Sequence, residues 1–252
     1  MLRPIWIITK PMKIKLLLSF PLVLALAAIA IAQSVTITPK KVTYRRPKPQ
    51  SSFKKTFTIR YPKVAGLSTA LNKKVQDSIS YERALKLNLK EELSEYQWLE
   101  EADYEVNYNK KGVLVITLSM EGTAAYPSSV SKTVVLDLKT GDRVTPQNAF
   151  TNLAGLAAMC KKAQKAEIAS SIEEIKKDNP DEQDPQSLFS DADFKIKDLN
   201  NFSVNDQGVT FQYNYGFPHV IQALQPDGQF FFDWSALKPY IKAGSLLRRL
   251  VR

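Results

Sequence analysis

The first residue that could do chemistry is His219, the only histidine in the chain, in the aromatic stretch Tyr-Gly-Phe-Pro-His of residues 215–219. Histidine changes charge near neutral pH and is a frequent general base, which makes it the first candidate for catalysis. A Ser-His-Asp triad would have to use it, but no serine stands in a nucleophile context such as Gly-x-Ser-x-Gly. We therefore interpret His219 as a structural or surface residue, and we expect Tyr215, Phe217 and His219 to form an exposed ligand-binding lip.

Motifs for metal binding and acyl transfer are absent or have a simpler explanation. A His-Glu-x-x-His zinc site needs two histidines, so we expect neither a metal nor a cofactor. Lys139-Thr-Gly141 matches the Lys-Thr-Gly of penicillin-binding proteins, and Ser51 and Ser129 each stand three residues before a lysine. Neither serine begins a predicted helix, so we interpret Lys-Thr-Gly as a turn that ends a strand. The sequence therefore predicts no catalytic residue.

Cys160 is the only cysteine, so the chain cannot form an internal disulfide. We interpret it as a small apolar residue on the buried face of a helix. Without disulfides the fold must depend on its hydrophobic core, and a chain of 252 residues is long enough to build one.

The positive charge is concentrated at the N-terminus. The chain has a formal charge of +10, but residues 1–32 hold four basic residues, residues 33–60 hold eight, and neither segment holds an acid. From Tyr61 onward 23 basic residues face 25 acidic ones, a charge of −2. A nearly neutral body, with no aromatic residues interleaved in a basic patch, gives no support to nucleic-acid binding.

Residues 1–32 have the pattern of a secretory signal peptide. Lys13 and Lys15 precede an apolar run over residues 16–32, which ends in Ala30-Ile31-Ala32 and predicts cleavage after Ala32. Met12 could open such a peptide by itself, so residues 1–11 are interpreted as an optional upstream extension. The run is short for a spanning helix of ~20 residues, which leaves an uncleaved membrane anchor as the less favoured alternative. We expect the protein to be exported to the periplasm or the extracellular space.

Three further segments are predicted after the signal peptide. Residues 33–52 are basic, contain prolines and have few apolar residues, so they are interpreted as a linker, with a short strand at Val35–Thr38 as an open alternative for its first residues. Residues 53–242 form the folded domain, and residues 243–252 a basic C-terminal tail. Contact with a membrane is expected only through the signal segment or the basic linker.

Hydrophobic periodicity predicts an α+β domain in which helices pack on an antiparallel sheet. Helices are expected where apolar residues recur every three or four positions, over residues 67–79, 85–93, 153–177 and 234–241. Strands are expected where apolar and polar residues alternate, over residues 53–61, 104–108, 113–120, 133–138, 193–197, 202–205, 209–213 and 230–232. The turns between the central strands are too short for crossover helices, which indicates hairpins and a meander.

The order of these segments resembles an exported domain of unknown function. It is similar to the ectodomain of the lysozyme-responsive anti-sigma factor RsiV and to the accessory domain of the peptidoglycan deacetylase PdaC. The resemblance rests on Tyr61-Pro-Lys-Val-Ala-Gly-Leu67, Tyr104-Glu-Val-Asn-Tyr108, Val135-Leu-Asp-Leu-Lys-Thr-Gly141, Gly216-Phe-Pro-His219 and Phe232-Asp-Trp234. It spans residues 53–242.

The resemblance implies a single α+β unit without catalytic residues of its own. We expect a non-catalytic envelope module that binds a cell-wall glycan, as in peptidoglycan, or a wall-lytic protein such as lysozyme. Residues 1–15 are too short for a sigma-binding segment, so only the binding role is carried over. The alternative is a hydrolase or transferase that acts on the cell wall through an unrecognised site near His219.

Overall fold

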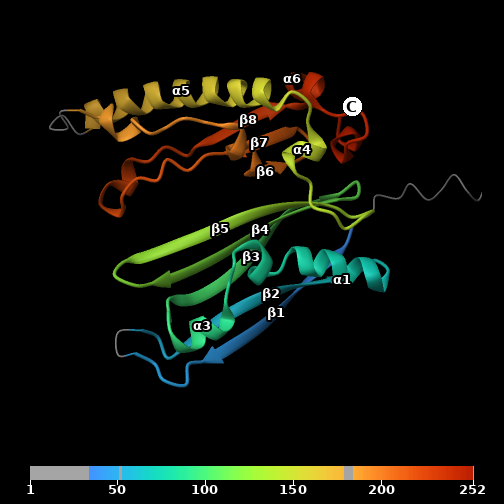
Figure 1. Cartoon of the computed structure of the whole chain (residues 1–252), viewed down its shortest axis with the longest axis vertical. Coiled ribbons are helices and arrows are strands. Elements are labelled where there is room, and N and C mark those ends of the chain that lie inside the picture. The colour runs from blue at the N-terminus through green and yellow to red at the C-terminus, as the bar shows by residue number, and fades with distance from the viewer. Residues whose placement is uncertain (1–33, 51–52, 179–183, 252) are drawn as a thin grey trace, which may run out of the picture. The chain divides into compact units, whose positions relative to one another are not determined.

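Five strands form the larger of two sheets in the computed structural model, which describes residues 34–50, 53–178 and 184–251 (Figure 1). Their spatial order is their chain order, β1-β2-β3-β4-β5. All neighbours pair antiparallel except β2 and β3, which pair in parallel. The strands are β1 (Thr36–Arg45), β2 (Thr56–Ala65), β3 (Leu99–Lys110), β4 (Val113–Thr123) and β5 (Pro127–Asp137).

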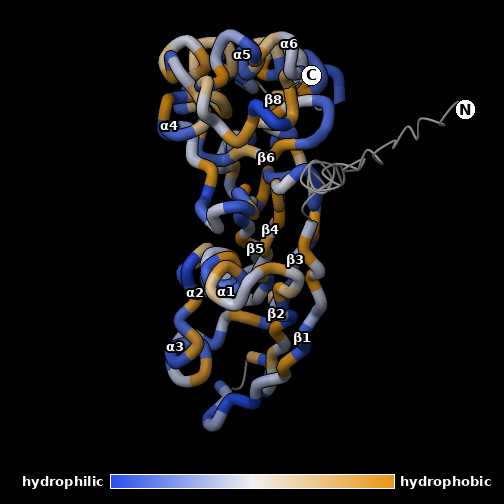
Figure 2. Tube along the Cα trace, turned by 90° about the vertical axis from the view of Figure 1, so that its right-hand side faces the viewer, coloured by the Kyte–Doolittle hydropathy of each residue, from blue (hydrophilic) through white to orange (hydrophobic). Residues whose placement is uncertain are grey.

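The parallel pair requires a crossover, and three short helices supply it. They are α1 (Thr69–Ser78), α2 (Tyr81–Ala84) and α3 (Leu89–Ser94). In both views these helices lie along one face of the five-stranded sheet (Figures 1 and 2). The sequence predicts one helical stretch over residues 85–93, but only its second half is helical, as α3. Lys86, which adopts a positive φ of 61°, lies between the end of α2 and the start of α3.

The second sheet has three antiparallel strands, covered by the long helix α5 (Leu153–Asp178). Its strands are β6 (Phe202–Val204), β7 (Gly208–Gln212) and β8 (Gln229–Asp233). The remaining elements are α4 (Pro146–Ala149), α6 (Trp234–Leu237) and the 3-10 turns η1 (Ser187–Phe189), η2 (Ile196–Asn200), η3 (His219–Leu224), η4 (Lys238–Tyr240) and η5 (Leu246–Arg249).

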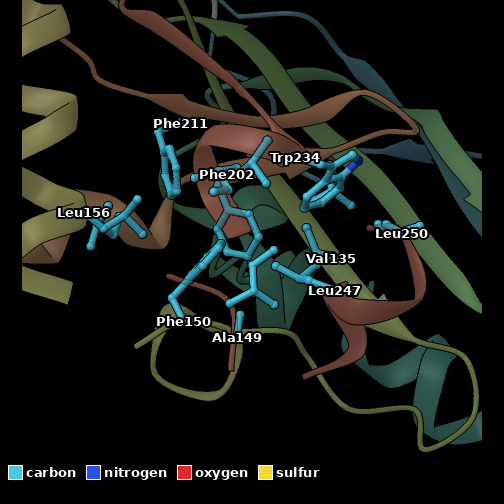
Figure 3. Close-up of a cluster of buried hydrophobic side chains, with 14 of the residues drawn as sticks. Val135, Ala149, Phe150, Leu156, Phe202, Phe211, Trp234, Leu247 and Leu250 are labelled. Carbon is cyan, nitrogen blue, oxygen red and sulfur yellow. The ribbon is translucent and has the colours of Figure 1, made fainter. Parts of the chain in front are cut away.

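Strand β4 contributes to two hydrophobic clusters because its side chains alternate between the faces of the sheet. Val113 and Val115 pack with α5 and the second sheet in what we call the α5-side cluster. Leu114 and Ile116 pack with the helices of the crossover in the α1-side cluster. Figure 3 shows part of the α5-side cluster, where side chains from β5, α4, the second sheet and the C-terminus meet.

The predicted fold class is confirmed, since the structure is a single mixed domain of mostly antiparallel strands with helices packed on them. The long helix and the β3-β4-β5 meander are also confirmed. The strand predicted over residues 193–197 is wrong, because Ile196 begins the 3-10 turn η2. Strand β2 continues past Pro62, which pairs with Pro39 of the edge strand β1. Neither proline has an N–H to donate, and the two strands continue on both sides of this pair.

The segment predicted as a basic linker is part of the sheet. Strand β1 pairs with β2 over its whole length, although its composition is polar. The next residue, Arg46, has a fully buried side chain that donates to the carbonyls of Glu92 (3.2 Å) and Leu99 (2.7 Å). The domain therefore begins at least as early as Thr36, and the prediction that residues 33–52 form a linker is wrong for the described part of that range.

The predicted C-terminal tail is also part of the core. Leu246, Leu247 and Leu250 are buried in the α5-side cluster. Arg249 forms a bidentate ion pair with Asp137, with nitrogen–oxygen distances of 2.9 and 3.0 Å. Residues 243–252 contain both basic and apolar residues, so their average composition resembles that of a solvated tail although three of the leucines are buried.

The predicted signal peptide and Ser51 lie outside the described residues. Within residues 34–50, 53–178 and 184–251, no helix has the combination of length and hydropathy that a bilayer span requires.

Candidate functional site

A groove of about 530 Å³ opens between the β4–β5 hairpin and the segment that contains η3. In Figure 1 the tip of this hairpin and the orange-red η3 segment lie on the same side. The groove is within the size range of small-ligand sites, which is about 300–1,000 Å³. Its lining residues are Glu100, Glu121, Gly122, Thr123, Pro127, Ser128, Ser129, Phe217, His219 and Gln222.

Two carboxylates reach the groove from neighbouring strands. Glu121 lies opposite Glu101, and a bulge between Leu99 and Glu101 accommodates Glu100 as an extra residue. Met120 is buried in the α1-side cluster, so strand alternation directs Glu121 to the opposite face. Bulges commonly redirect a side chain near a functional site. The extra residue of this bulge is Glu100, and Glu100 lines the groove.

Lys54 holds Glu100 in its ionised form. The Lys54 ammonium donates a hydrogen bond to the Glu100 carboxylate, and this bond is the main reason that the pKa of Glu100 is lowered. The side chain of Glu100 is still 26% exposed. The groove therefore presents an ionised hydrogen-bond acceptor. A general acid in glycoside hydrolysis needs the opposite shift, a raised pKa.

Gly122 lets two strands approach closely beside the groove. A Cβ at this position would lie 2.1 Å from the carbonyl oxygen of Trp98, so only glycine fits without a shift of the backbone. Trp98 in turn donates its indole N–H to the hydroxyl oxygen of Ser128 at 2.9 Å. This contact fixes one wall of the groove at the start of β5.

An aromatic pair lies at the mouth of the groove. The rings of His219 and Tyr126 are stacked, with centroids 5.2 Å apart and planes inclined by 23°. Tyr126 is 63% exposed, and His219 is exposed as well. Tyr126 belongs to the turn between β4 and β5, whereas His219 begins η3, so the pair links the two sides of the groove.

The predicted lip of three residues is only partly present. Phe217 and His219 line the groove, but Phe217 is 8% exposed and packs with Phe189 and Ile175. Tyr215 does not line the groove: it is partly buried and donates its hydroxyl to Glu167 of α5 at 2.6 Å. Burial and this carboxylate raise the pKa of Tyr215. The expectation of an exposed lip is therefore wrong for Tyr215 and Phe217, and α5 supplies the apolar face that buries them.

The interpretations of Lys139-Thr-Gly141 and Cys160 are confirmed. Strand β5 ends at Asp137, and Gly141 adopts a φ of +72° in the turn that follows. Ser129 lies in β5 and not at the start of a helix. Cys160 is fully buried, and burial raises the pKa of its thiol to about 12. Among the residues that the structure describes, no group of three or more histidine, cysteine, aspartate or glutamate side chains is arranged to hold a metal ion.

Most of the polar groove residues could not be found from the sequence. Glu100, Glu121 and Ser128 line the groove from three strands and Gln222 from a 3-10 turn, and no motif connects them or brings Tyr126 next to His219. One signal was present for Glu121, because its position next to Met120 in an alternating strand places it on the face away from the α1-side cluster. The bulge that brings in Glu100 leaves no comparable pattern in the sequence.

Comparison with known proteins supports the fold. No family model matches the sequence, and no curated protein matches it. A solved DUF3298 family protein from Pseudomonas aeruginosa PAO1 has a TM-score of 0.55 and 14% identity, covering 86% of this chain and 97% of that one. A DUF3298 member from Bacteroides fragilis has a TM-score of 0.53 and 12% identity, covering 88% and 98% respectively. At these identities the likeness shows a shared fold.

Proposed function

We propose that the protein is a non-catalytic binding module of the cell envelope, and that its groove takes a segment of a cell-wall glycan such as peptidoglycan. One observation carries this proposal: an ionised carboxylate and an exposed ring line the same groove. Glu100 provides the carboxylate, and His219, which is stacked on the exposed ring of Tyr126, provides the ring. The solved DUF3298 proteins share the fold, and the resemblance to the domains of RsiV and PdaC suggests the envelope as the setting.

The chemistry of the groove suits a polyhydroxylated ligand. The C–H faces of a sugar ring are apolar and can stack on aromatic rings. Sugar hydroxyls can donate to the carboxylates of Glu100 and Glu121, while the amide of Gln222 both donates and accepts. The hydroxyls of Ser128 and Ser129 add further donors and acceptors on β5, next to Glu121 of the neighbouring strand β4.

A glycan is favoured over a protein partner by the size of the groove. A stable protein interface buries about 800 Å² on each side, whereas this groove has the volume of a small-ligand site. A lysozyme-like protein is therefore the second candidate, and it is one arm of the test below. Export through the predicted signal peptide would bring the module to either ligand.

A hydrolase or transferase is the alternative function, because His219 and two glutamates line one groove. The lowered pKa of Glu100 argues against this carboxylate as the general acid of such an enzyme, since Lys54 already holds it as an anion. His219 stacks on Tyr126, and no hydroxyl of the described residues forms a hydrogen bond with it. These contacts support recognition of a ligand more than acid–base catalysis.

The proposal is tested by measuring how the full chain binds soluble peptidoglycan fragments, insoluble peptidoglycan and lysozyme. Tyr126→Ala should weaken glycan binding by about three- to tenfold, the typical value of one aromatic contact. Tyr96→Ala is the matched control, because Tyr96 is 62% exposed, does not line the groove and, unlike Tyr126, is not stacked on His219. It should leave binding unchanged.

Three other outcomes would change the conclusion. Retention by lysozyme alone would replace the glycan with a protein partner. Release of soluble sugar products, abolished by His219→Ala, would favour the hydrolase. No retention on either ligand would rule out the binding module in its specific form.

A further inference from the structure

A second cavity, of about 160 Å³, lies beside the edge strand β5 and is separate from the groove. Strand β5 supplies Lys132 and Thr133, the segment that leads into α4 supplies Arg143 and Thr145, and Asn200 and Phe202 close the far side. An isolated antiparallel bridge between Leu136 and Arg143 folds this segment back on the strand. Two cationic side chains are thereby brought to one small cavity.

These two cations have no anionic partner among the described residues. No carboxylate there lies within 4 Å of Lys132 or Arg143, and each of the two donates to a backbone carbonyl instead. Lys132 donates to Asn200 at 3.3 Å, and Arg143 donates through Nη2 to Ser78. The Nε of Arg143 is buried, and no acceptor in the described part of the chain is in hydrogen-bond range.

The electrostatic environment disfavours both charges. Burial and the neighbouring Arg143 lower the pKa of Lys132, while burial and the nearby Arg83 lower the pKa of Arg143. Arg83 likewise forms no ion pair with a described residue. Like charges in a partly buried cavity destabilise the fold unless an anion compensates them, and a buried N–H without an acceptor adds to this cost.

From this cluster we infer that the cavity between Lys132 and Arg143 binds a small oxyanion, a phosphate or a carboxylate group. The arginine provides a planar set of N–H donors that suits such groups, and the lysine provides a point charge. A water molecule occupies about 30 Å³, so the cavity holds the equivalent of about five. It is thus below the usual size of a small-ligand site, about 300–1,000 Å³, but accommodates a single oxyanion. This inference does not depend on the glycan-binding proposal, because the two sites share no lining residue.

Titration of the full chain with inorganic phosphate, followed by calorimetry at constant ionic strength with sodium chloride as balance, tests the inference. The unmodified protein should show saturable binding. Lys132→Met should weaken binding about tenfold, the typical loss for one charge-assisted hydrogen bond. Lys139→Met removes the same charge from an exposed position outside the cavity and should change the affinity less than about twofold.

Parallel titrations with acetate and with glycerol 1-phosphate identify the source of the group. Binding of phosphate alone indicates a free ion, binding of glycerol 1-phosphate an esterified phosphoryl group, and binding of acetate a carboxylate. Each result supports the site if Lys132→Met weakens it and Lys139→Met does not. The inference is overturned if none of the three anions binds saturably, or if both variants lose affinity equally.

Discussion

Arg46 is a buried charged residue in a basic segment whose composition predicts exposure to solvent. It follows β1 within a basic segment, yet its guanidinium is enclosed between Glu92, the carbonyls of three residues and the ring of Phe57, which lies 4.8 Å from it. Burial lowers the pKa of Arg46, and the nearby Glu92 partly opposes this shift. A buried charge of this kind is tolerated only because its donors are occupied by acceptors.

Replacing Arg46 should therefore destabilise the domain strongly. We expect Arg46→Ala to reduce the free energy of unfolding by about 3–5 kcal/mol, because Glu92 and the carbonyls would lose their donor. The preceding residue is exposed, and Arg45→Ala should cost less than about 0.5 kcal/mol. Urea denaturation of both variants measures the difference. Equal stabilities would show that the buried contacts of Arg46 contribute nothing.

At the scale of elements, the C-terminal segment closes the α5-side cluster. Turn η5 inserts Leu246 and Leu247 into the cluster, and the side chain of Ser245 caps the turn by accepting from the N–H of Leu247 at 3.1 Å. The ion pair between Arg249 and Asp137 then joins the turn to the end of β5. Figure 3 shows Leu247 and Leu250 beside Val135 of that strand.

Leu247 tests whether this segment is structural. Its side chain is fully buried, so Leu247→Ala should lower the free energy of unfolding by about 2–5 kcal/mol through lost burial and the cavity left behind. Arg248→Ala, at an exposed neighbour, is the control and should cost at most about 1 kcal/mol, because it removes only one hydrogen bond, from the guanidinium to the carbonyl of Ile241 at 3.1 Å. Thermal unfolding monitored by circular dichroism compares them. A Leu247→Ala variant as stable as the parent would restore the interpretation of residues 243–252 as a dispensable tail.

At the scale of the whole domain, the two clusters share β4 and β5. Leu114 faces the α1-side cluster, while its neighbours Val113 and Val115 face the α5-side cluster. If the β4 side chains of one cluster are displaced, the β4 backbone that carries the side chains of the other cluster is disturbed as well. We therefore expect the two clusters to unfold together as one cooperative unit.

Cys160 reports on this coupling because it belongs to the α5-side cluster. Its pKa of about 12 leaves about one thiolate in 10⁴ molecules at pH 8, so labelling by a thiol reagent should require opening of the domain. Leu114→Ala, in the other cluster, should cost about 2–5 kcal/mol and accelerate labelling by the corresponding factor. Because labelling proceeds through the opened domain, raising the pH should accelerate it through the ordinary pKa of an exposed thiol, about 8.5.

The exposed substitution Glu105→Ala provides the control for this experiment, since it should change neither stability nor labelling appreciably. If Leu114→Ala lowers the stability but leaves the labelling rate of Cys160 unchanged, the two clusters open independently, contrary to our expectation.

Local sequence patterns were sufficient to predict the α+β class, the long helix, the central meander and the buried position of Cys160. These features depend on local periodicity, and a pattern of period 2 or 3.6 is complete within one element. The burial of Arg46 and Leu247 could not be predicted in this way, since it depends on partners far away in the chain. The same holds for the candidate site. Glu100, Glu121, Tyr126 and His219 meet because a bulge, a hairpin and a 3-10 turn converge, and α5 withdraws Tyr215 from the surface. Long-range packing sets such positions, and no local spacing in the sequence encodes it.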